Sequence, residues 1–172
     1  ATPGSYHAQY EKGLSDHPGM TLGGWPHRTE SKGYVRARSK DPFEAPVIQP
    51  NYLDTEHDRN VIVQGLKWCR RFLQTEPLAP DRGPELLPGA ACESDDDLLT
   101  YAASTGSTVY HPVSTCRMGR DDLAVVDPEL KLRGMTGLRV VDASVMPTMV
   151  SANTNAATLM IAEKAAQLIP DA

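Results

Sequence analysis

Residues 137–147, GLRVVDASVMP, followed by residues 151–156, SANTNA, decide how the C-terminal part of the chain is organised. Leu138, Val140 and Val141 predict a short buried strand over residues 138–141, which ends at Asp142. A polar turn then opens a helix near Asn153, whose first backbone N–H groups form a site that stabilises an anion. An Asp at a strand end can bind sugar hydroxyls or orient a loop. Alternatively, Asn153 or Asn155 is simply the N-cap.

Hydrophobic periodicity predicts helices at 56–75, 95–104 and 154–169. Thr55 and Ser94 are the expected N-caps of the first two helices. Short strands are predicted at 20–25, 33–39 and 108–110 in addition to the one at 138–141. Because these elements do not alternate as regular βαβ units, we expect an α+β fold with a mixed or antiparallel sheet flanked by helices.

Composition excludes several classes of protein. The 172 residues carry a formal net charge of −5, which argues against a nucleic-acid partner. No apolar run approaches the roughly 18 residues of a membrane span, so we expect no transmembrane segment. Three widely spaced cysteines without a C-x-x-C pair favour free thiols in a reducing compartment. We therefore expect a cytoplasmic location, with peripheral membrane association of the full enzyme as the alternative. Scattered histidines predict no metal site.

Residues 109–119, VYHPVSTCRMG, form the second segment of interest. His111 precedes a proline, so its ring is expected at an element boundary, where catalytic groups often lie. Imidazole is the side chain best suited to proton transfer near neutral pH. A structural histidine hydrogen-bonded within a turn is the alternative that the local sequence leaves open.

Several motifs together resemble the C-terminal part of the glucose–methanol–choline (GMC) oxidoreductases, particularly their choline dehydrogenase and alcohol dehydrogenase branch. The matching stretches are SKGYVRARSKDP, PVIQPNYL, STVYHPVSTCRMG and the run from VVDPELKLRG to IAEKAAQLI. These motifs occur in the family's order and spacing, and they cover essentially the whole chain. A single motif of this kind would carry little weight, whereas the combination is specific.

The resemblance implies an FAD-dependent oxidation of an alcohol, either choline-like or another primary alcohol, by hydride transfer to flavin N5. It implies that His111 takes the hydroxyl proton and that Asn153 binds the substrate oxygen. The Asp142–Ala143 step resembles the family's contact with the ribityl–pyrophosphate region of FAD. The backbone of Thr154 and Asn155 resembles its contact with the flavin O2 edge.

One departure from the family pattern concerns the cofactor. The G-x-G-x-x-G fingerprint, which the family carries near the N-terminus of a longer chain, is not in these residues. We therefore expect an expressed fragment or one part of a split enzyme, which needs the missing N-terminal FAD-binding portion and binds FAD weakly or not at all alone. Residues 1–137 would be a partial substrate-binding domain, and residues 138–172 would return to the FAD-binding domain.

Two alternatives differ in their chemistry. The first is a GMC-type hydroxynitrile lyase, in which FAD is retained only as a structural group. The second is an isolated, non-catalytic fragment that does not bind FAD by itself. Reduction of the flavin by an alcohol in the full-length protein would distinguish an oxidoreductase from the lyase, and flavin absorbance of the purified 172 residues would show whether they bind FAD alone.

Overall fold

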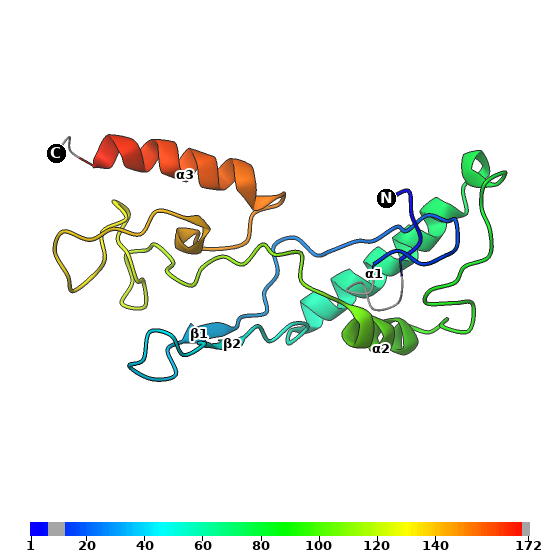
Figure 1. Ribbon diagram of the computed structural model, residues 1–172, viewed down its shortest axis with the longest axis horizontal. Helices are drawn as coiled ribbons and strands as arrows, with labels where there is room; N and C mark the ends of the chain where they lie inside the picture. The colour runs from blue at the N-terminus through cyan, green and yellow to red at the C-terminus, as the bar shows by residue number, and fades with distance from the viewer. Residues whose placement is uncertain (7–12, 170–172) are drawn as a thin grey trace. The chain divides into compact units, whose positions relative to one another are not determined.

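The computed structural model of the protein describes residues 1–6 and 13–169 (Figure 1). Its helices and strands are β1 (Tyr34–Arg36), β2 (Val47–Gln49), α1 (Glu56–Leu73), the 3-10 helix η2 (Glu76–Leu78), α2 (Asp95–Thr105), the 3-10 helix η3 (Ala143–Val145) and α3 (Thr154–Leu168). The predicted α+β class is confirmed, as are the three predicted helices to within two residues at each end.

The described residues form two compact units. The first contains Ala1–Pro26 and Asn51–Val109, and the second contains His27–Pro50 and Tyr110–Ala172. The first unit therefore holds α1 and α2, whereas the second holds the β1–β2 hairpin, η3 and α3. Within the described part of the chain, no helix has both the length and the apolar character needed to cross a membrane.

The helices of the first unit begin at side chains that cap them. Thr55 Oγ1 accepts a hydrogen bond from the Asp58 backbone N–H at the start of α1. At the start of α2, Ser94 Oγ accepts from Asp97 N–H, and the Asp97 carboxylate accepts from Ser94 N–H. This reciprocal pair is a capping box. The two helices pack together, and Leu98 of α2 is completely buried.

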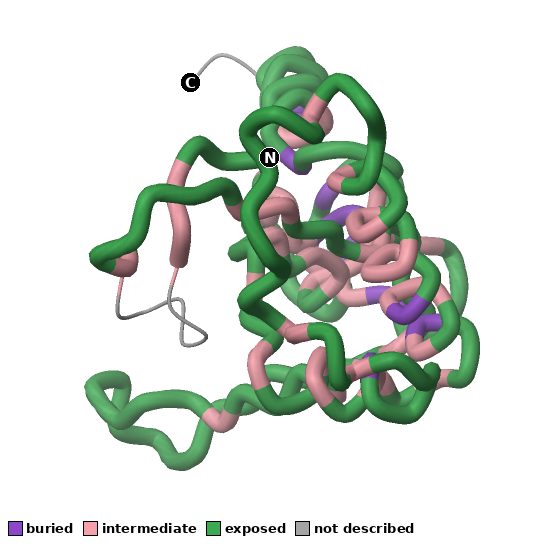
Figure 2. The backbone as a smooth tube through the Cα atoms, turned by 90° about the vertical axis from the view of Figure 1, so that its right-hand side faces the viewer, coloured by how far each residue is buried: buried purple, intermediate pink, exposed green. Residues whose placement is uncertain are grey.

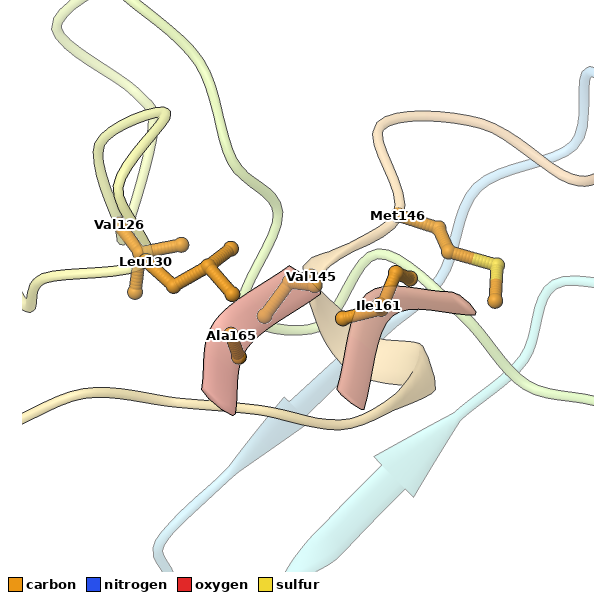
Figure 3. Close-up of a cluster of buried hydrophobic side chains, with 6 residues drawn as sticks. All are labelled: Val126, Leu130, Val145, Met146, Ile161 and Ala165. Atoms are coloured by element: carbon orange, nitrogen blue, oxygen red, sulfur yellow. The ribbon is translucent and has the colours of Figure 1, made fainter. Parts of the chain in front are cut away.

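The second unit has a small apolar core drawn in Figure 3. Its six buried side chains are Val126, Leu130, Val145, Met146, Ile161 and Ala165. They come from a loop, from the η3 region and from one face of α3, and η3 packs directly against α3. Buried residues are few along the backbone tube in Figure 2, so this cluster is what holds these three segments in place.

The sheet is smaller than the sequence suggests. The predicted strand at 33–39 contains β1, which pairs antiparallel with β2 in the register Tyr34 to Gln49. An antiparallel sheet is therefore confirmed, but it has only two strands in the described residues. Side chains on both strands are largely exposed, so packing contributes little to this hairpin.

Three predicted strands are wrong. Residues 138–141 form a single isolated bridge, between Arg139 and Lys131, and Leu138 is half exposed. Only the short segment near residue 131 pairs with them, so no strand extends over these residues. Residues 20–25 likewise contain a single bridge, from Thr21 to Thr2. At 108–110, Tyr110 has φ of 59°, which is incompatible with an extended strand. Short apolar runs without a hydrogen-bonding neighbour do not become strands.

The predicted domain boundary between residues 137 and 138 stays a prediction about the longer enzyme. In the structure, Val126 and Leu130 lie on one side of this boundary, and Val145 and Ile161 lie on the other. All four side chains belong to the same core. The two sides of the boundary therefore depend on each other for their apolar burial within this unit.

Candidate active site

The loop that carries His111 is fastened to the η3 region by main-chain hydrogen bonds. Cys116 N–H donates to the Ser144 carbonyl over 3.1 Å, and Met118 N–H donates to the Val145 carbonyl over 2.8 Å. Val145 is completely buried in the core of the second unit. The loop is therefore held against the apolar core of this unit, and His111 is half-buried.

Asn153 occupies the N-cap position of α3 but does not act as a cap. Its side chain makes no hydrogen bond to the first turn of the helix. Instead, Asn153 Oδ1 lies 2.9 Å from His111 Nε2, although the two residues are 42 positions apart in the sequence. The structure thus brings together the two residues that were predicted to be catalytic, and it does not support the alternative of Asn153 as a simple cap.

The His111–Asn153 pair presents an imidazole nitrogen and a carboxamide at one place. The donor and acceptor roles in this contact depend on the imidazole tautomer and on the orientation of the amide. A neutral amide cannot accept a proton at pH 7, whereas an imidazole can. If a ligand hydroxyl contacts both groups, His111 is therefore the one that can remove its proton.

Asp142 and Ala143 lie at the start of η3. Asp142 Oδ1 accepts a hydrogen bond of 2.7 Å from Ser144 N–H, and the Asp142 side chain is exposed. Through this contact Asp142 orients the local backbone, which is one of the two roles that the sequence left open for it. Ala143 is half-buried and packs against the apolar core. Asp142 thus combines a local structural contact with an exposed carboxylate.

Thr154 and Asn155 are the first two residues of α3. Thr154 is 8% exposed, whereas Asn155 is exposed. Because Asn153 does not cap the helix, its side chain leaves the first-turn N–H groups available to another partner. The positive end of a helix of 15 residues is therefore presented beside the His111–Asn153 pair.

An exposed ion pair follows the His111 loop. Arg117 and Asp121 form two hydrogen bonds, and the guanidinium group holds the pKa of the Asp121 carboxyl well below its usual range. Arg133 also donates to the backbone carbonyls of Gly119 and Asp121. These contacts fix the turn after the loop. Among the residues that the structure describes, no three His, Cys, Asp or Glu side chains gather as metal ligands.

Two contacts near the pair were not predicted from the sequence. Ser114 Oγ donates to the Met146 carbonyl over 2.7 Å, and Arg28 Nε donates to Ser151 Oγ over 2.5 Å. Both join segments that are distant in the sequence. No local signal indicates them, because a serine or arginine in a polar loop has many possible partners.

Comparisons with known proteins identify the family of this chain. A family model described as GMC oxidoreductase matches residues 29–162. The chain is 48% identical over 146 residues to the mitochondrial choline dehydrogenase of Homo sapiens, covering 84% of this chain and 25% of that protein. It is 44% identical over 140 residues to an alcohol dehydrogenase [acceptor] of Pseudomonas putida, covering 81% of this chain and 25% of that protein.

Solved structures show the same relationship. The crystal structure of pyridoxine 4-oxidase from Mesorbium loti aligns with a TM-score of 0.78 at 38% identity, over 82% of this chain and 28% of that one. An FAD-dependent oxidoreductase from Chaetomium thermophilum aligns with a TM-score of 0.72 at 28% identity, over 79% of this chain and 24% of that one. The chain spans about a quarter of the length of the curated relatives it matches. With the family model matching more than half of its residues, the chain belongs to the GMC oxidoreductase family.

Proposed function

We propose that this chain supplies the substrate-side catalytic groups of an FAD-dependent enzyme that oxidises an alcohol to the aldehyde. The observation that carries the proposal is the 2.9 Å contact between His111 Nε2 and Asn153 Oδ1, made by residues 42 positions apart. A core of six buried residues holds the segments around this contact in place. An arrangement supported in this way is suited to orient a small hydroxyl group.

The residues around the pair fit a flavin. The first turn of α3 is not capped by Asn153, so its N–H groups and positive dipole can stabilise negative charge on the N1–C2=O edge. The exposed carboxylate of Asp142 can accept hydrogen bonds from ribityl hydroxyls. When bound, FAD would supply the chemistry of accepting a hydride from the carbinol carbon. Thr154, Asn155, Asp142 and Ala143 are the residues proposed to contact it.

In this proposal His111 and Asn153 have different roles at the substrate oxygen. The Asn153 carboxamide donates a hydrogen bond to that oxygen and fixes its orientation. The imidazole of His111 accepts the hydroxyl proton as the carbinol carbon loses its hydride. Both groups must turn from each other toward the substrate, which their half-buried and exposed positions permit.

We propose a primary alcohol, choline included, as the substrate class. This proposal is supported by the relatives named choline dehydrogenase and alcohol dehydrogenase, at 48% and 44% identity. An N-terminal FAD-binding portion of a longer enzyme is the proposed partner of this chain. Without it, the uncapped α3 terminus and one carboxylate offer only part of a binding site, so we expect weak FAD binding by the 172 residues alone.

The experiment that tests the function is anaerobic mixing of the FAD-loaded enzyme with choline or another primary alcohol. Loss of the oxidised-flavin absorbance is the expected result. His111→Ala should slow this reduction by about 10²–10⁴-fold, the usual size of a general-base contribution. His57→Ala is the matched control, because His57 is an exposed histidine in α1 of the other unit.

Two outcomes would contradict the proposal. A flavin that stays oxidised with every alcohol, while a cyanohydrin is cleaved, would identify the lyase instead. A His111→Ala enzyme that is reduced as fast as the His57→Ala control would remove His111 from the role of base.

A further inference from the structure

We propose that Ser114 is a positioning residue for His111 and acts through its hydrogen bond to the Met146 carbonyl, a proposal that rests on the proposed function of His111. Ser114 Oγ donates to this carbonyl over 2.7 Å, and the serine is half-buried. Met146 directly follows η3 and is buried in the core of the second unit. The bond therefore joins the loop that carries the proposed base to the segment that leads into α3.

The backbone around His111 needs such support. Tyr110 and Ser114, on either side of it, have φ angles of 59° and 70°. Non-glycine residues rarely adopt this left-handed conformation, and it persists only where surrounding contacts impose it. The Ser114 hydroxyl supplies a contact at the strained residue itself. Its hydrogen bond is therefore well placed to maintain the unusual path of the loop.

The Ser114 bond belongs to a series of attachments along the loop. Cys116 and Met118, two and four residues further on, donate their N–H groups to the carbonyls of Ser144 and Val145. Of these three attachments, the one made by Ser114 is closest to His111 in the sequence. It is also made by a side chain, so a substitution can remove it while the main-chain donors of the loop stay in place.

Loss of this attachment should displace His111 from Asn153. Ser114 would then be less restrained in its left-handed conformation, since the next of these bonds to the η3 region begins at Cys116. A misplacement of about 1 Å in a catalytic arrangement can cost on the order of 10²-fold in rate. We therefore expect the rate constant of flavin reduction to fall by about 10–100-fold, with a small effect on substrate binding.

The test uses Ser114→Gly and Ser114→Ala in the FAD-loaded enzyme. Both remove the hydroxyl, but glycine adopts a φ of 70° without strain and alanine does not. Ser104→Ala is the matched control, because Ser104 Oγ also donates to a backbone carbonyl, that of Tyr101 in α2. The readouts are the ¹⁵N chemical shift of His111 Nε2, the rate constant of reduction per bound flavin, and the substrate dissociation constant.

We expect both Ser114 variants to change the His111 Nε2 shift and to slow reduction, while Ser104→Ala does neither. A Ser114→Gly enzyme with the wild-type shift and a rate within twofold of wild type would overturn the proposal, whatever the alanine variant does. A rate per bound flavin that is unchanged, with only the flavin content reduced, would also overturn it by showing a purely structural role. If His111→Ala itself leaves reduction unchanged, the proposed function fails, and the Nε2 shift still decides whether Ser114 positions the ring.

Discussion

The two compact units of this chain are built in different ways. The first contains helices that begin at capping side chains within three residues of their partners, as with Thr55 and Asp58 or Ser94 and Asp97. The second brings its important groups together over long separations, such as His111 with Asn153 and Ser114 with Met146. Local contacts thus produce helices in one unit, whereas long-range contacts produce the candidate active site in the other.

Removing a buried side chain from each unit gives the largest expected contrast. Leu98→Ala and Ile161→Ala should each lower the free energy of unfolding by about 2–5 kcal/mol, because each leaves a cavity. Only Ile161→Ala acts on the core around η3, so it should also disturb the His111–Asn153 contact. Chemical denaturation and the ¹⁵N shift of His111 Nε2 measure the two effects. If Leu98→Ala altered the ¹⁵N shift of His111 Nε2 as much as Ile161→Ala does, the expectation that only the core of the second unit supports the pair would be wrong.

A smaller effect is expected from the local contacts of the first unit. Ser94→Ala removes the hydroxyl half of the α2 capping box and should cost about 1 kcal/mol of unfolding free energy. Asn153→Ala is the informative comparison, because Asn153 has the same N-cap position on α3 but makes no capping bond. We expect Asn153→Ala to change the unfolding free energy less than Ser94→Ala does. An equal loss in both variants would contradict this expectation.

The smallest expected effect is on the pH and salt dependence of stability, for which one carboxylate from each unit is compared. The pKa of Asp97 is lowered by its hydrogen bonds with Ser94, and that of Asp121 is lowered chiefly by Arg117. Each folded-state pKa lies below its unfolded value. Each group therefore adds stability above the unfolded pKa, near 4, and loses it as the pH falls through the folded pKa.

Salt should separate these two carboxylates. The exposed ion pair of Asp121 is screened by ions, whereas the neutral hydroxyl and amide donors of Asp97 are not. A ¹³C titration in low and high NaCl should therefore move the pKa of Asp121 upward with salt more than that of Asp97. Equal salt responses would contradict the assignment of Arg117 as the main cause.

The sequence predicts the helices well for a physical reason that particular residues illustrate. Thr55 and Ser94 accept bonds from residues three positions away, so their role can be read locally. The predicted strand at 138–141 fails because a strand needs a neighbour, and residues near 131 supply only a single bridge. The same limit applies to Ser114, whose left-handed backbone and bond to Met146 have no local signature.

The sequence by itself determined the helices, the α+β class and the two segments in which His111 and Asn153 lie, since caps, periodicity and motif order are local properties. It also named both residues through the family resemblance. Only the tertiary structure decided that they meet at 2.9 Å and that Asn153 turns to His111 instead of capping α3. That choice depends on the burial of Val145 and Ile161, which fixes α3 against η3 and the His111 loop.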